Sequence, residues 1–165
     1  MEFIELDKNK IEDIKKMSFL VSSIIKEYYD PLLGSIQNDY MINKFQSFEA
    51  ISDQLNHNYH YCFINLDNQD IGFLAYFYKI DCLYLSKLYL VKEFRGKGYA
   101  RIILDFLVDI CIKSNLKGIE LNVNKYNKTR FIYEKLGFVK IKDEVNDIGS
   151  GFVMDDYVYY YEIKE

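Results

Sequence analysis

Three consecutive segments rich in aromatic and β-branched residues constrain the fold of this 165-residue chain more than any other feature. They are residues 59–66, 71–79 and 82–91, and two short stretches, the polar 67–70 and Ile80-Asp81, separate them. Such runs favour β-strands, and connections this short join antiparallel neighbours. The centre of the chain is therefore predicted to form an antiparallel meander.

Helical periodicity precedes the meander. Apolar side chains recur at helical spacing over residues 8–28, where Asp7 can cap the start and Asp30-Pro31 is predicted to end the helix. A second helical region, 36–57, is predicted to break near Ser47, a residue type that caps helices.

The elements after the meander alternate between helix and strand. We expect a helix at 99–114, a strand at 119–123, a short helix at 127–136, and strands at 137–142 and 158–163. A further short strand is expected at the start of the chain, at 2–6. Hairpins followed by a strand–helix–strand unit give a mixed α/β (α+β) fold. The sheet is predicted to be mostly antiparallel, with six to seven strands and helices on both faces, in a single domain over residues 1–165.

Composition narrows the functional class. The net charge of -4 argues against a protein devoted to binding nucleic acid, whose affinity comes largely from neutralised phosphates. No signal peptide and no apolar run of membrane-spanning length is present, and the three cysteines lack metal-ligand spacing. We therefore expect a reduced cytoplasmic protein with no metal site and no membrane partner.

The charges are divided unevenly along the chain. Residues 92–142 carry 12 basic and 5 acidic side chains, whereas residues 1–91 carry 8 and 13, and residues 143–165 carry 1 and 7. All three arginines, Arg95, Arg101 and Arg130, lie in the basic segment. Ordinary solvated charges sorted by chance would give the same division, and so would a site that holds an anion beside a cation.

A glycine-containing loop, FRGKGYA at 94–100, lies between a predicted strand and a predicted helix. Gly96 and Gly98 let the backbone approach a ligand, and the helix that follows presents unpaired N–H groups. Arg95 and Lys97 add full positive charges. The predicted guest is a diphosphate, and the alternative is a tight strand-to-helix turn with surface lysines.

The loop excludes two common diphosphate binders. The P-loop pattern G-x-x-x-x-G-K-[ST] is absent, and a dinucleotide fingerprint would need glycine or alanine where Arg101 stands. The residues after the loop are also too few for the rest of a doubly wound domain and a substrate domain. Coenzyme A is the diphosphate ligand that remains.

Three segments carry a family resemblance: LYLVKEFRGKGYA, with its R-x-x-G-x-A core, then LNVNKYN, then YEKLGF. Together they resemble the GCN5-related N-acetyltransferases (GNAT) over about residues 59–142. The resemblance implies the GNAT fold, acetyl-CoA as cofactor, and direct transfer of its acetyl group to a primary amine.

The resemblance also implies residue roles. The strand backbone at Leu88 to Leu90 pairs with the pantetheine arm, the loop wraps the pyrophosphate, and Tyr133 protonates the departing thiolate. Tyrosine suits this role because its pKa, about 10, is not far above that of a thiol, about 8.5. The implied cofactor-binding residues are Leu88, Tyr89, Leu90, Arg95, Gly96, Lys97, Gly98, Tyr99, Ala100, Arg101 and Asn127.

One spacing departs from the family. Asn127 precedes Tyr133 by six residues, whereas the corresponding asparagine usually precedes the tyrosine by seven. A one-residue deletion rotates a helix by about 100°. Tyr133 keeps its distance to Gly137, so Asn124 or Lys128 are alternatives to Asn127 in its role.

The resemblance places the acceptor against residues 27–34 and against the loop before the last strand, 149–161. The candidate acceptor-binding residues there are Glu27, Tyr28, Asp30, Asp155 and Asp156. Carboxylates and tyrosine rings suit a cationic amine, and the chain ends are similar to those of bacterial polyamine (spermidine- or spermine-type) acetyltransferases. A carboxylate or a water relay is expected to serve as the base.

Two alternatives to the acetyltransferase remain. One is a non-catalytic acyl-CoA-binding or regulatory domain of the same fold, and the other is a nicotinamide-dependent oxidoreductase. A small-molecule amine is the expected partner, nucleic acid is not, and homodimerisation is an expectation of the family.

Overall fold

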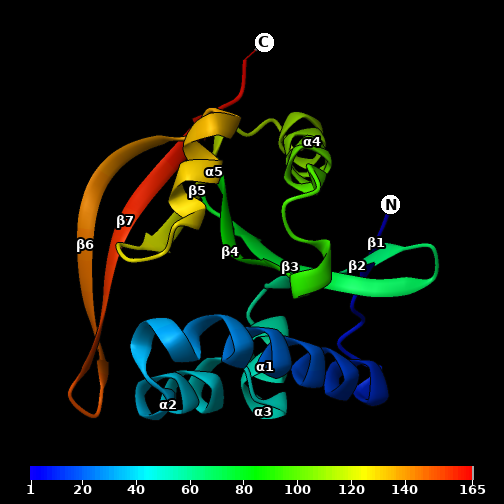
Figure 1. The fold of residues 1–165 in the computed structure, drawn as a ribbon. Helices are drawn as coiled ribbons and strands as arrows, with labels where there is room; N and C mark the ends of the chain where they lie inside the picture. Colours follow the sequence, from blue (N-terminus) through cyan, green and yellow to red (C-terminus); the bar gives the residue numbers. More distant parts are fainter. Residues whose placement is uncertain (165) are drawn as a thin grey trace. The chain divides into compact units, whose positions relative to one another are not determined.

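The computed structural model describes residues 1–164, in which seven strands belong to a sheet of order β1-β2-β3-β4-β5-β7-β6 (Figure 1). β4 pairs with β5 in parallel, whereas β1 with β2, β2 with β3, β5 with β7 and β6 with β7 are antiparallel, so the expected mixed, mostly antiparallel α/β fold is confirmed. The chain divides into two compact units, described separately below. The N-terminal unit comprises Met1–Phe77 and Lys87–Lys97, and the C-terminal unit comprises Tyr78–Ser86 and the chain from Gly98 onward.

The N-terminal unit holds three helices and three strands of its own. They are β1 (Glu2–Glu5), α1 (Ile11–Leu33), α2 (Ser35–Phe45), α3 (Phe48–Asn56), β2 (His60–Leu66) and β3 (Gln69–Tyr78, whose last residue begins the other unit). Helix α1 lies beside α2 and α3 (Figure 1). Its buried stripe, from Ile14 to Tyr29, packs with Ile51 of α3 and with Phe63 and Phe73 of the sheet to form the core of this unit.

Helix α1 differs from the predicted helix at both ends. It begins at Ile11, because the Asp7 carboxylate accepts the Asn9 amide in a separate turn before the helix. It also continues past Pro31 and ends at Gly34, which has a φ of +83°. Proline removes one helical hydrogen bond, but the contacts of Leu33 with the core retain the last turn. The prediction that Asp30-Pro31 ends the helix is therefore wrong.

The break in the second helical region is confirmed. Helix α2 ends at Phe45, and the Ser47 hydroxyl accepts the Ala50 amide at 3.1 Å at the start of α3. The hairpin between β2 and β3 is tighter than the predicted four-residue turn. Asp67 and Asn68 both have positive φ, so two residues suffice for a turn that matches the twist of the strands.

The C-terminal unit contains α4 (Tyr99–Lys113), β5 (Gly118–Asn124), α5 (Thr129–Leu136), β6 (Val139–Gly149) and β7 (Phe152–Glu162). Strand β4 (Cys82–Leu90) contributes its first five residues to this unit, and the rest belong to the N-terminal unit. β4 pairs with β5 only from Cys82↔Gly118 to Leu85↔Leu121, while β5 continues to Asn124 along β7.

The last two strands are much longer than predicted and form a hairpin that Figure 1 shows as two strands running side by side. Residues 149–161, expected as a loop before the last strand, lie mostly in β7. The aromatic and β-branched residues on either side of Asp155 and Asp156 carry the strand through these two acids, and the turn is confined to glycines and Ser150. Both aspartates are therefore strand residues.

Candidate functional site

The loop after β4 presents two glycines in the left-handed conformation. A short 3₁₀ turn, η1 (Lys92–Phe94), precedes Gly96 and Gly98, whose φ angles are +73° and +81°. A Cβ on either glycine would meet no atom within 4 Å, so backbone conformation and not crowding calls for glycine here. Gly98 is the N-cap of α4 and no side chain caps that helix, which leaves its first N–H groups for a ligand.

Arg95 contacts helix α1. Its Nε–H donates to the Leu90 carbonyl at 2.9 Å, and its two terminal nitrogens donate to the Glu27 carboxylate at 2.7 and 3.3 Å. The guanidinium also lies 4.9 Å from the centre of the Tyr28 ring. The structure thus brings together Arg95, a predicted cofactor residue, and two predicted acceptor residues.

The other predicted cofactor residues, apart from Asn127, lie in β4, in the loop and at the start of α4. Leu88, Tyr89 and Leu90 are half-buried, and Lys97 lies over the Phe94 ring at 5.5 Å. Residues 99–101 begin α4, where Tyr99 and Ala100 are half-buried and Arg101 is exposed.

Tyrosines gather on the N-terminal unit next to Glu27. The Tyr29 and Tyr89 hydroxyls lie 2.9 Å apart, and the Tyr28 ring meets both rings edge-on. The Asp30 carboxylate has other partners: Asn38 donates a hydrogen bond to it at 2.8 Å, and Lys26 forms an ion pair with it at 3.0 Å. These two partners lower the pKa of Asp30, so it is an occupied carboxylate.

Lys87 is a functional candidate that sequence reasoning missed. Only 8% of it is exposed, and its ammonium donates to Gln46 Oε1 at 2.7 Å, to Gln54 Oε1 at 3.1 Å and to the Tyr61 hydroxyl. A further bond to the Phe45 carbonyl places it at the negative end of the α2 dipole. Within residues 1–164 no carboxylate pairs with it, and burial lowers its pKa to about 7.

We expect the stability of this protein to rise with pH above 7 because of Lys87. The folded state releases the Lys87 proton near pH 7, whereas the unfolded chain keeps it up to the ordinary value of 10.5. The unfolded state therefore binds more protons in this window, and the free energy of unfolding should increase by up to about 1.4 kcal/mol per pH unit. Urea denaturation from pH 7 to 9 measures this.

Lys87→Met is the matched variant, because methionine keeps the length of the side chain and has no proton to release. The difference in unfolding free energy between the original protein and Lys87→Met should grow in favour of the original as pH rises. Parallel pH profiles would show that Lys87 is not held neutral.

Tyr133 is held firmly in the C-terminal unit. It lies on α5 with only 8% of its surface exposed, and its ring meets Phe138 edge-on with centroids 5.4 Å apart. Gly137, with a φ of +109°, ends the helix, and the Phe138 amide donates to the Tyr133 carbonyl. The segment YEKLGF thus forms a helix end whose glycine cap orients the tyrosine, as local sequence rules predict.

Asn127 makes backbone contacts. It is buried, and its side-chain oxygen accepts the Thr129 amide at 2.9 Å just before α5. The backbone N–H of Asn127 donates to the Asn124 carbonyl at 2.9 Å. Asn127 therefore shapes the turn that leads to Tyr133, and the alternatives Asn124 and Lys128 flank the same turn.

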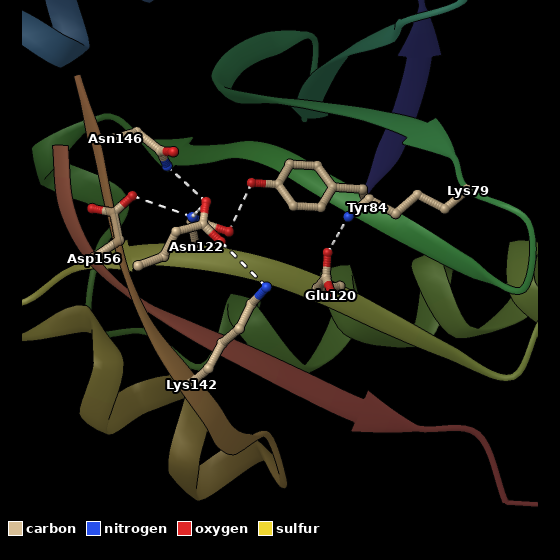
Figure 2. A network of polar contacts seen from close by, with 8 residues as sticks. Lys79, Tyr84, Glu120, Asn122, Lys142, Asn146 and Asp156 are labelled. Carbon is tan, nitrogen blue, oxygen red and sulfur yellow. Dashed lines mark hydrogen bonds and ion pairs between the residues drawn. The ribbon is translucent and has the colours of Figure 1, made fainter. Parts of the chain in front are cut away.

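A polar chain crosses the sheet of the C-terminal unit (Figure 2). The Tyr84 hydroxyl donates to Asn122 Oδ1 at 2.9 Å, and Asn122 Nδ2 donates to Asp156 at 3.3 Å and to Glu144 at 3.4 Å. Asn122 therefore joins β4, β6 and β7 through its side chain. Asn122 belongs to the segment LNVNKYN, but the sequence predicts no role for it or for Tyr84 and Glu144, because their meeting depends on strand order.

Asp156 differs from the acids around it. Asp155 pairs with Lys125 at 2.8 Å, and Glu144 lies 3.6 Å from Lys142, but no lysine or arginine of the described residues pairs with Asp156. Asp156 is only 3% exposed. Burial raises its pKa, with smaller effects of Glu144 and Asp155 in the same direction and of Asn122 and Lys125 in the other.

Asp156 and helix α5 lie on opposite faces of the C-terminal strands. The Tyr159 hydroxyl donates to Glu134 of α5, so Tyr159 points to the helical face. Side chains alternate along β7, and Asp156 is three residues from Tyr159, so Asp156 points to the other face. There it lies beside its register partner, Asn124 of β5. Tyr133 and Asp156 thus belong to different faces of one unit.

Comparisons with known proteins agree on one family. A family model described as an acetyltransferase (GNAT) domain matches residues 34–154. No curated protein sequence shows significant similarity to the chain. Helices long and apolar enough to cross a membrane are absent from residues 1–164.

Several solved structures share the fold. The PaiA N-acetyltransferase of Thermoplasma acidophilum, in complex with coenzyme A, aligns with a TM-score of 0.74 and 21% identity over 98% of this chain and 99% of that one. The spermidine N-acetyltransferase of Vibrio cholerae, with CoA and spermine, gives 0.65 and 18% over 98% and 95%. An aminoglycoside 6'-acetyltransferase type Ii gives 0.65 and 16% over 100% and 99%.

Proposed function

Since this chain belongs to the acetyltransferase (GNAT) domain family, we propose that it transfers the acetyl group of acetyl-CoA to a primary amine of a small, cationic acceptor. The amine attacks the thioester directly, so no covalent enzyme intermediate forms. The observation that carries the proposal is the left-handed, uncrowded pair Gly96 and Gly98 at the uncapped start of α4. We further propose that residues 1–165 act as a single domain, which the division of β4 between both units supports.

The loop residues fit a diphosphate on chemical grounds. Backbone N–H groups at Gly96, Gly98 and the first turn of α4 donate to phosphate oxygens, and a helix N-terminus favours negative charge. Arg95, Lys97 and Arg101 supply full charges. Leu88 to Leu90 would pair with the pantetheine arm through their backbone, as an added strand does, and the N–H near Leu90 would stabilise the oxyanion.

Tyr133 is proposed as the general acid. The phenol gives its proton to the leaving thiolate, and the packing on Phe138 holds the ring in place for that transfer. Asn127 acts as a positioning residue, since it shapes the turn before α5 and so directs the helix that carries Tyr133.

Asp156 is proposed as the base that accepts the proton of the attacking amine. It is the buried acid that lacks an ion pair, Asn122 orients its carboxylate, and its raised pKa brings it closer to that of an amine. Asp155 is a weaker candidate because Lys125 holds it.

The acceptor class follows from charge and from the relatives. Glu27, Asp30 and the acids of β7 lie in the two acidic segments of the chain, outside the basic stretch that contains the cofactor loop. The solved relatives include a spermidine acetyltransferase and an aminoglycoside acetyltransferase, whose acceptors are polycations. We therefore propose a polyamine-like acceptor.

Thiol release across an amine panel tests this function. With acetyl-CoA as donor, spermidine, spermine and an aminoglycoside should release free CoA thiol faster than neutral amino acids or peptides. A protein that binds CoA in calorimetry but releases no thiol with any amine would instead be the non-catalytic acyl-CoA-binding domain.

Tyr133→Phe should lower kcat by about 10²-fold, because the phenolic proton is lost while the ring keeps its packing. The dissociation constant of CoA should stay unchanged. Tyr126→Phe is the control, since Tyr126 is 71% exposed in the preceding turn and should retain full activity. Equal rates in both variants would move the acid to another residue.

Asp156→Asn should lower kcat/KM by about 10²-fold, because the amide cannot accept the proton. In the original protein kcat/KM should fall as pH drops through the raised pKa of Asp156, and the variant should lose this acidic limb. The neighbouring Asp155→Asn serves as the control and should keep the limb. Identical pH profiles for Asp156→Asn and the original protein would contradict the assignment.

A further inference from the structure

Arg95, a proposed ligand of the pyrophosphate, is paired with a carboxylate in this structure. The two Glu27 carboxylate oxygens accept hydrogen bonds from the two terminal nitrogens of the guanidinium, at 2.7 and 3.3 Å. The remaining side-chain hydrogen bond of Arg95 among residues 1–164 runs from its Nε–H to the Leu90 carbonyl. The same fork of donors matches a carboxylate and a phosphate equally well in geometry, so the two anions are competitors for one group.

The pair with Glu27 is weak enough to be exchanged. The side chains of Arg95 and Glu27 are 29% and 42% exposed. Ion pairs this open to water contribute a factor of about five or less to an equilibrium. A pyrophosphate carries more charge than a carboxylate and is also bound by the N–H groups of the loop. Arg95 can therefore turn from Glu27 to the pyrophosphate while the Leu90 carbonyl keeps it at the loop.

The guanidinium also stands where a cationic acceptor would be recognised. It donates to the Glu27 carboxylate, and its carbon lies 4.9 Å from the centre of the Tyr28 ring. A carboxylate beside a tyrosine ring is a site for an ammonium group. Arg95 thus fills this site with a cation from the chain itself.

We propose that Arg95 occupies the acceptor's cation subsite, formed by Glu27 and Tyr28, until Arg95 exchanges Glu27 for the pyrophosphate of acetyl-CoA. The ammonium group of the acceptor can then form an ion pair with Glu27 only after the cofactor has bound. This rests on the proposed function, since it takes acetyl-CoA as the ligand of the loop. It makes Glu27 a specificity-determining residue that the cofactor uncovers.

Calorimetric titration with CoA tests the competition without any acceptor. Glu27→Gln should bind CoA more tightly than the original protein, by about 1.5- to 5-fold, because Arg95 no longer has a carboxylate partner. In the Arg95→Gln background the same change at Glu27 should have no effect. The four proteins form a double-mutant cycle whose coupling measures the exchange, and thermal melts confirm that each is folded.

Glu93→Gln is the matched charge control. Glu93 is an exposed acid two residues before Arg95 with no ion pair among the described residues, so its removal changes net charge near the loop and leaves the pair intact. Equal tightening in Glu93→Gln and Glu27→Gln would reduce the effect to general electrostatics. Unchanged or weaker CoA binding by Glu27→Gln would make the pair purely structural, and either result overturns the proposal.

The acceptor provides a second readout. With the best amine of the panel, Glu27→Gln should raise KM for the amine several-fold more than it lowers kcat, and Glu27→Asp should recover part of that loss. An unchanged KM would remove Glu27 from the acceptor site. Failure of the original protein to bind CoA at all would overturn the proposed function itself, and is thereby distinguished from failure of the exchange.

Discussion

The connection between strand β4 and helix α4 is the constraint on which the proposed site depends. The backbone must turn within a few residues and still leave the first N–H groups of the helix uncovered, and two left-handed residues, Gly96 and Gly98, achieve this. Side chains at these positions would strain the backbone, although there is space for them. The loop is therefore shaped for an anion by its conformation before any charged side chain is considered.

Two buried ionisable groups, one in each unit, have pKa values that shift in opposite directions for the same reason. Burial disfavours charge, so it lowers the pKa of Lys87 to about 7 and raises the pKa of Asp156. In each case neutral partners take the place of an ion pair: Gln46 and Gln54 for the lysine, Asn122 for the aspartate. Groups held this way titrate closer to neutral pH than solvated ones, which suits proton transfer and makes stability depend on pH.

Local sequence rules succeeded wherever a feature is decided within a few residues. Ser47 caps α3 and Gly137 ends α5, because the cap bonds involve only nearby amides. The same rules failed at Pro31, where contacts with the core outweigh a lost hydrogen bond. At residues 149–161 the β-favouring residues on either side of Asp155 and Asp156, paired with the preceding strand, carry both aspartates into the sheet.

The sequence by itself determined the order of elements, the glycine loop and the family, because spacing and residue type within short segments specify them. Only the tertiary structure decided which polar side chains come into contact. Glu27 and Arg95 are 68 residues apart, and Asn122 and Asp156 are 34 apart, so helix packing and strand order bring each pair together. No local pattern encodes such contacts, since the free energy that selects them comes from folding the whole chain.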